Sequence, residues 1–329
     1  MILRLFRENQ TFTLLFTLLY AIFIWLFNGL VLDLTPDFGS FYHFGIYSFI
    51  PSLSNFNKFG LLTTGINVIL IFITGVYLNR ITVKYQVIRL RSNLPLFMFF
   101  VLSTSFFITN NGISFPLLTV FILLIIVDMI FSSLDNKAVS FRFFDSSLLI
   151  AIASLIHTHF VVFYIFILFI WIQYRLHHWR ELVFIIFGAF LPYFFLVVVF
   201  YLAGSNLSEW KDSVAIITEF NTVLIYRNSF YYLTGFLLFM FLATSGKILQ
   251  DWVKMKINVR KYSLIFLTLF ITAILITLIF PVFEKEIIFF FALPLSFLFA
   301  YYFASCRITI FNQVLFVLLI VGSVLVLMV

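Results

Sequence analysis

Long apolar runs separated by short polar loops fill this chain from one end to the other. Eleven runs can be placed to within a few residues. They lie at about 11–31, 60–79, 94–110, 115–133, 146–157, 160–174, 182–203, 229–248, 262–281, 287–304 and 308–329. About 20 apolar residues in a helix cross the hydrocarbon core of a bilayer, and a helix satisfies its own backbone hydrogen bonds there. The pattern therefore predicts an all-α, polytopic transmembrane helical bundle with about 11 spans.

The run "SSLLIAIASLIHTHFVVFYIFILFIWIQYRLHHW", residues 146–179, contains His157 and His159 near its middle. If 146–174 were one span, the 20 basic residues would divide 11 to 9 between the two sides of the membrane. A break at the histidines places 16 of the 20 on the side of the N-terminus. Because cytoplasmic loops carry an excess of Lys and Arg, the second count favours a short helical hairpin over 146–174 and a cytoplasmic N-terminus. Each half, at about 12 to 15 residues, is short for a full crossing, so the hairpin should pack against other helices or line a water-filled cavity.

Composition agrees with a membrane protein and narrows its partners. Apolar residues make up 64% of the 329 residues and charged residues only 10%, which excludes an ordinary soluble domain and indicates a single integral-membrane domain over 1–329. The net charge of +7 comes from basic residues that flank the apolar runs one loop at a time, so nucleic acid is not an expected partner. The expected partner is the lipid bilayer. We therefore expect a multi-pass protein of the bacterial inner membrane. The first run, 11–31, is too long for a signal-peptide core and is expected to be retained.

Two segments on the predicted outer side are longer than a turn requires, namely 32–59 and 203–230. The first is aromatic and amphipathic, and the pattern of the second is also that of a surface helix, which predicts short helices lying in the membrane interface. The outer side carries seven carboxylates against four basic residues, Lys58, Lys211, Arg227 and Lys285. Asp33 and Asp37 lie four residues apart and would share one face of a helix. Such carboxylates could act as a general base or ligate a divalent metal, or they could form a solvated face.

The order of these features resembles the GT-C class of integral-membrane glycosyltransferases, which take sugars from polyprenyl-phosphate carriers. The resemblance lies in "VLDLTPDFGSFYHF" after the first run and in the paired helices of "FFDSSLLIAIASLIHTHFVVFYIFILFIWIQY". It is architectural, because the chain has no adjacent Asp-Asp or Asp-Glu pair. It implies that Asp33, or less readily Asp37, activates an acceptor or binds a divalent metal ion. It also implies that Arg227, with Lys211 nearby, binds the phosphate of the lipid carrier, since guanidinium pairs with phosphate through a planar fork.

The histidines allow three interpretations. His157 and His159 would point to different sides of a continuous helix, so they could share a ligand only at a turn. They lack the third ligand of a usual zinc centre, although His43 could contribute, and we assign no metal site. They could instead line a hydrated substrate pocket or handle protons, or they could form a structural, hydrogen-bonded turn.

Asp128 is the only carboxylate well inside an apolar run. Such an acid suggests a proton or cation relay, but it also lies near enough to the end of its run to pair with Lys137 or Arg142. The leading function is thus extracytoplasmic glycosyl transfer in cell-envelope glycan synthesis. One alternative is a non-enzymatic membrane subunit of an envelope assembly or secretion complex, with other membrane proteins as partners. A second is a proton-coupled transporter.

Overall fold

The computed structural model of this chain is helical throughout the residues that it describes. These residues are 2–8, 10–31, 60–88, 92–104, 114–135, 139–173, 179–203, 228–279 and 288–328. No β-strand occurs within these ranges. The predicted all-α fold class is therefore confirmed for this part of the chain.

Each of the eleven predicted apolar runs overlaps a helix in the described residues. The α-helices are α1 (Ile2–Glu8), α2 (Gln10–Val31), α3 (Gly60–Lys84), α4 (Leu94–Thr104), α5 (Phe115–Asp135), α6 (Val139–Ile156), α7 (Phe163–Gln173), α8 (Trp179–Ala203), α10 (Asn228–Asp251), α11 (Ile257–Ile279), α12 (Ile288–Ser305) and α13 (Ile310–Met328). Two short 3-10 helices, η3 (Thr158–Val162) and η5 (Trp252–Lys254), lie in connections. The sequence analysis did not predict α1, whose buried Leu3 and Phe6 anchor the start of the chain on the bundle.

Several helices are long and apolar enough to cross a membrane. Within the described residues, five segments meet both criteria: Thr64–Lys84, Pro116–Ser133, Trp179–Val199, Gly235–Lys254 and Ile257–Leu275. The other apolar helices have shorter described stretches, so the figure of about 11 crossings stays a prediction. The interfacial helices predicted in the two outer segments fall on 32–59 and 204–227, which lie outside the described residues.

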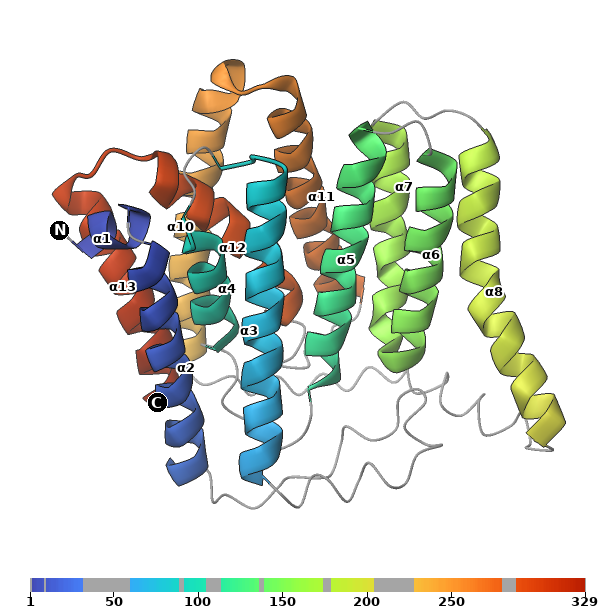
Figure 1. Cartoon of the computed structure of the whole chain (residues 1–329), viewed down its shortest axis with the longest axis horizontal. Coiled ribbons are helices and arrows are strands. Elements are labelled where there is room, and N and C mark those ends of the chain that lie inside the picture. Colours follow the sequence, from blue (N-terminus) through green and yellow to red (C-terminus); the bar gives the residue numbers. More distant parts are fainter. Residues whose placement is uncertain are drawn as a thin grey trace.

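Successive helices from α2 onward run alternately down and up in the view of Figure 1, across the longest axis of the molecule. The end of α2, the start of α3, the end of α8 and the start of α10 therefore lie at one end, the lower one in the figure. The turn between α6 and α7 lies toward that end as well. The opposite, upper end holds the connection from α10 to α11.

The predicted break at the two histidines is confirmed. Helix α6 stops at Ile156, His157 has extended backbone angles of φ −137° and ψ 106°, and the chain continues through η3 into α7. The expected start at 146 was wrong, because α6 already begins at Val139. Its 18 residues span about 27 Å, and η3 with α7 spans about 26 Å, so neither half is as short as the apolar pattern indicated.

The centre of the bundle is a short helix surrounded by longer ones. All eleven residues of α4 are buried, and α3 and α12 pack against it. Much of the filling is phenylalanine: the rings of Phe266 and Phe297 stack with centroids 4.0 Å apart, and Phe6 lies 4.8 Å from Phe97. Offset and edge-on aromatic pairs of this kind add to the burial of apolar surface. Because α4 is enclosed by protein, its 11 residues need not span the bilayer.

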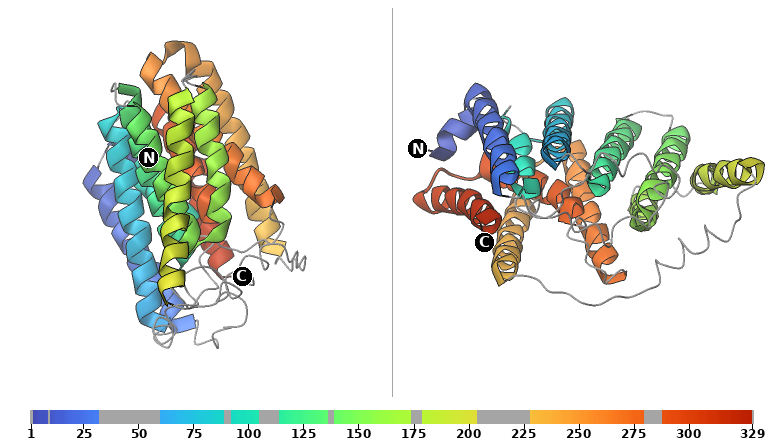
Figure 2. Two further views of the ribbon diagram at one scale, coloured as in Figure 1. Left: turned by 90° about the vertical axis from the view of Figure 1, so that its right-hand side faces the viewer. Right: turned by 90° about the horizontal axis from the view of Figure 1, so that it is seen from below.

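Helix α8 lies at the periphery, where it packs against α6 (Figure 2). The two backbones approach closely at Gly188, and the Ser147 hydroxyl donates a hydrogen bond of 2.5 Å to the carbonyl of Ile185. A Cβ atom at Gly188 would lie 2.6 Å from Ser147 Oγ and 2.7 Å from the carbonyl oxygen of Phe144. Small residues permit such close helix contacts within a membrane.

Replacing Gly188 by Ala should loosen this contact. The added methyl group meets a backbone carbonyl that cannot move alone, so we expect the free energy of unfolding to fall by about 1–3 kcal/mol. Thermal unfolding of the purified protein in detergent measures the change. The matched control is Gly235→Ala in α10, where nothing lies within 4 Å of the new Cβ. Equal melting temperatures for the two variants would contradict the close contact.

The alternating helix directions give a second prediction. In a chain whose Cys306 is replaced by Ala, a cysteine at Thr158 should react with a membrane-impermeant maleimide from the side opposite to cysteines at Asn136 and His178. Background from the natural cysteine should also be low, because Cys306 is buried and burial raises the pKa of its thiol, which leaves less reactive thiolate. Labelling of positions 136 and 178 from opposite sides would overturn the hairpin topology.

Candidate functional site

Most residues predicted to act on a substrate lie outside the described part of the chain. Asp33, Asp37 and His43 fall in 32–59, and Lys211 and Arg227 fall in 204–227. Their roles, including the activation of an acceptor or the binding of a divalent metal ion by Asp33 or Asp37, stay predictions. In the described ranges, no three His, Cys, Asp or Glu side chains come together as a metal site would require.

His157 lies in an aromatic part of the core. Its side chain is 6% exposed, and its ring centroid is 6.0 Å from that of Phe290, which also packs on Phe160 and Phe163. Its carbonyl accepts a 3.0 Å hydrogen bond from the Phe160 amide, which closes the turn. These contacts favour the interpretation of His157 as part of a structural turn. The backbone of His159 lies in η3, and its side chain is outside the description.

The best-defined polar cluster in the described residues surrounds Asp128 on α5. Its carboxylate accepts hydrogen bonds from Tyr77 Oη at 3.0 Å and from Tyr85 Oη at 2.8 Å. Lys84 Nζ forms an ion pair with Asp128 Oδ1 at 2.8 Å. Tyr85 Oη also lies 3.2 Å from the backbone carbonyl of Asp128, so it joins α5 to the end of α3 twice.

The geometry of α3 explains how three donors meet one carboxylate. Tyr77 and Lys84 are seven residues apart, two turns of a helix, and so share the face that packs on α5. Asp128 was expected to pair with Lys137 or Arg142, but its partner is Lys84. The sequence reasoning sought a partner close along the chain, whereas tertiary contact supplied one 44 positions away.

These three contacts compensate the negative charge of the Asp128 carboxylate where it lies on α5. The Asp128 side chain is 21% exposed and that of Lys84 is 49% exposed, so the Coulomb attraction alone contributes only about 0–1 kcal/mol. Hydrogen bonds to a charged acceptor are stronger, at about 1.5–3 kcal/mol each. The cluster therefore acts mainly as a polar tie between α3 and α5.

The chain turns sharply just after Lys84. The Gln86 amide donates to the Val83 carbonyl at 3.2 Å, and the Val87 amide donates to the Thr82 carbonyl at 3.0 Å. This pair of bonds defines a Schellman motif, which needs a left-handed residue at the position of Gln86. Gln86 has φ 49°, the only positive φ of a non-glycine residue in the described chain. The motif brings the segment Lys84–Gln86 beside the start of α11, with which it lines one cleft.

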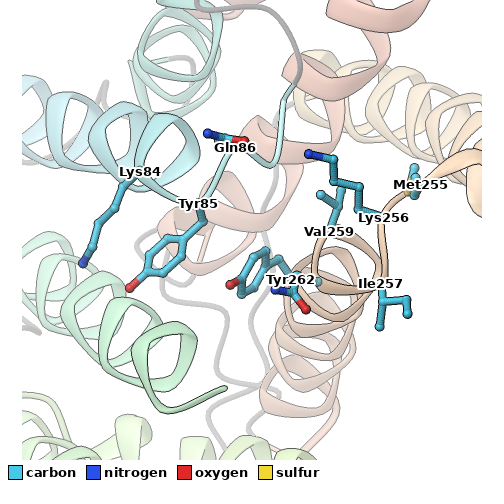
Figure 3. A pocket seen from close by; sticks show the side chains of 9 residues that line it. Lys84, Tyr85, Gln86, Met255, Lys256, Ile257, Val259 and Tyr262 are labelled. Carbon is cyan, nitrogen blue, oxygen red and sulfur yellow. The ribbon is translucent and has the colours of Figure 1, made fainter. Parts of the chain in front are cut away.

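A cleft of about 570 Å³ lies between this turn and the connection from α10 to α11 (Figure 3). Its walls are Lys84–Gln86 on one side and Met255–Val259 with Tyr262 on the other. The rings of Tyr85 and Tyr262 lie 5.2 Å apart at their centroids and form its floor. The Lys256 side chain extends toward Gln86, whereas the amine of Lys84 turns away from the cleft. This cleft was not predicted from the sequence, in which the basic loop "QDWVKMKINVRKYS" is the one signal near it.

These features define an all-helical protein with several helices long and apolar enough to cross a membrane, with polar clusters near the helix ends. A family model described as "Family of unknown function (DUF6427)" matches residues 39–328, and the chain belongs to that family. No curated protein and no solved structure matches the chain.

Removal of the Asp128 carboxylate should destabilise the contact between α3 and α5. We expect Asp128→Leu to lower the free energy of unfolding by about 2–4 kcal/mol, because two tyrosine hydroxyls lose a charged acceptor and Lys84 loses its partner. Asp128→Asn retains an acceptor oxygen and should cost less. Chemical denaturation of the detergent-solubilised protein measures both values.

The companion experiment is a double-mutant cycle with Lys84→Met. The double variant should lose less than the sum of the two single losses, because the two side chains interact directly. A stability unchanged in every variant, together with loss of proton-driven uptake in Asp128→Asn, would instead make Asp128 a proton relay.

Proposed function

We propose that this protein is an integral-membrane glycosyltransferase of the GT-C type. It transfers a glycosyl group from a polyprenyl-phosphate donor to an acceptor of the cell envelope, on the extracytoplasmic face of the bacterial inner membrane. The reaction takes place at the lower end of the bundle in Figure 1, to which the ends of α2 and α8 and the starts of α3 and α10 bring the chain.

One observation carries this proposal. The helices that flank 32–59 and 204–227 deliver the ends of both segments to the same end of the bundle, toward which the α6–α7 turn also points. These two segments contain five of the thirteen carboxylates, including Asp33 and Asp37, and three basic residues, including Arg227. Transfer from a phosphate-linked sugar needs a carboxylate that accepts the proton of the acceptor and a cation that stabilises the leaving phosphate.

The proposed step uses one residue of each kind. The Asp33 carboxylate takes the proton from an acceptor hydroxyl as its oxygen forms a bond to the anomeric carbon of the donor. The bond from that carbon to the carrier phosphate breaks, and its electron pair leaves with the phosphate oxygen. Arg227 stabilises the charge that develops there, as preorganised cations do for leaving phosphates. Asp37 is the second choice for the base.

The described contacts bear on the two alternatives. Asp128 is held by Lys84, Tyr77 and Tyr85, which supports a structural role over a proton relay. The outer face of α8 exposes large apolar side chains such as Phe187 and Phe190, each 62% exposed. A lipid environment accommodates such a face, and so would a partner helix of an envelope complex.

The enzyme hypothesis is tested by Asp33→Asn and Arg227→Gln. Each should abolish transfer of a radiolabelled sugar from polyprenyl-phosphate-linked donors in membranes that contain the protein, because one removes the base and the other the phosphate contact. We expect a loss of at least about 100-fold for Asp33→Asn, the lower range for removing a general base. Melting temperature and membrane yield should stay unchanged.

The control is Glu8→Gln, which removes an exposed carboxylate at the opposite end of the bundle, where Glu8 pairs only with Arg4 among the described residues. It should retain full transfer. If both site variants keep wild-type activity, the protein is not an enzyme of this type. Co-purification of a stable membrane partner would then favour a non-enzymatic subunit.

A further inference from the structure

The cleft at the upper end of the bundle is chemically unlike the proposed reaction site. We propose that it binds the phosphate headgroup of an anionic phospholipid from the leaflet at that end. This binding is separate from glycosyl transfer, because the cleft lies between the end of α3 and the start of α11, at the end of the bundle opposite to the α6–α7 turn.

The cleft lies at the depth of the lipid headgroups. Three segments that are long and apolar enough to cross a membrane end at this cleft: one finishes at Lys84, one finishes at Lys254 and one starts at Ile257. The ends of such helices lie at the level of lipid headgroups. On the rim, Val253 is 81% exposed and Ile257 is 69% exposed, which suits contact with lipid beside the headgroup.

The lining of the cleft carries positive charge. No acidic residue lines the cleft, and Lys256 extends across it toward Gln86 (Figure 3). Within the described residues, Lys256 forms none of the ion pairs. Lys84 contributes its aliphatic stem, since its amine pairs with Asp128 outside the cleft. One uncommitted positive charge matches the single negative charge of a phosphodiester.

The cleft is also lined by uncharged hydrogen-bond donors, which are backbone and side-chain amides. The Arg260 amide donates to the Lys256 carbonyl at 3.1 Å, which makes Lys256 the residue that precedes the first turn of α11. The amides of Ile257, Asn258 and Val259 therefore have no acceptor within the helix, and all three residues line the cleft. No acidic side chain occupies this first turn. The side-chain amides of Gln86 and Asn258 can add further hydrogen bonds to phosphate oxygens.

The turn that presents Lys256 is held independently of any ligand. The guanidinium of Arg260 donates to the carbonyls of Met255 and Val253, each at 3.1 Å. Because Arg260 stabilises the loop, it is not free to bind phosphate itself. The opposite wall is held by the Schellman motif at Gln86. A cleft whose two walls are fixed in this way loses little conformational entropy when it binds a headgroup.

The test uses the full chain, purified in a zwitterionic detergent. Native mass spectrometry measures the binding of phosphatidylglycerol and phosphatidylcholine, with inorganic phosphate and glycerol phosphate as soluble competitors. We expect wild-type protein to retain phosphatidylglycerol over phosphatidylcholine. Lys256→Gln should weaken phosphatidylglycerol binding roughly fivefold, the effect of one basic residue near an anionic lipid. The soluble competitors should displace the lipid only weakly.

Two further variants separate a site from general electrostatics. Lys254→Gln removes the same charge two residues away but outside the cleft lining, and it should change binding less than twofold. Asn258→Asp puts a negative charge into the cleft at a helix start where an acid stabilises the fold. It should weaken lipid binding at least as much as Lys256→Gln while the melting temperature holds or rises.

Three results would overturn the proposal. The first is equal retention of the two lipids. The second is an equal loss for Lys254→Gln and Lys256→Gln, which would indicate a diffuse basic surface. The third is binding of inorganic phosphate as strong as that of the lipid, which would make free phosphate the ligand. None of these results bears on glycosyl transfer, so the two proposals fail independently.

Discussion

The hydrocarbon core of a membrane offers no hydrogen-bonding partner, and this constraint governs the polar groups inside the apolar helices that the structure describes. Helices satisfy the backbone, and many hydroxyl side chains within them donate to a carbonyl three or four residues earlier in the same helix. Thr74 donates to the Leu70 carbonyl at 2.6 Å, and Ser154 donates to the Ala151 carbonyl at 2.7 Å. Asp128 cannot be satisfied within its own helix, and it draws Tyr77, Lys84 and Tyr85 to it instead. The tie between α3 and α5 follows from that requirement.

The same constraint limits where chain breaks can occur. The α6–α7 turn contains an unwound residue, His157, but its ring is buried against Phe290 and its backbone bonds on both sides are made. The short helix α4 is enclosed on all sides, with its eleven residues buried. Interruptions in the helical pattern are thus placed against protein. Phenylalanine suits this packing because its flat ring fills space between helices without a polar atom to satisfy.

The sequence predicts features that depend on neighbouring residues better than features that depend on contacts between helices. The apolar runs and the break at His157 are local in the chain, and charge counting located the break without any coordinates. The early start of α6 was missed because "VSFRFFD" mixes Arg142 and Asp145 with aromatic residues, so hydropathy alone placed the start of the helix too late in the chain. The partner of Asp128 was missed because it comes from another helix. The cleft was missed because a Schellman turn with Gln86 at φ 49° lacks the glycine that usually marks it.

The two ends of the bundle differ in a way that separates their chemistry. At one end, long segments rich in carboxylates join α2 to α3 and α8 to α10, and they carry Asp33 and Arg227, the acid and the cation that we propose for glycosyl transfer. At the other end, short basic connections bring Lys256 and the free amides of α11 beside Tyr85 and Tyr262. A membrane protein that binds lipid phosphate at its basic end is held at a defined depth and orientation. Under the two proposals, that anchoring fixes the depth of the opposite end, at which the lipid-linked donor is proposed to enter.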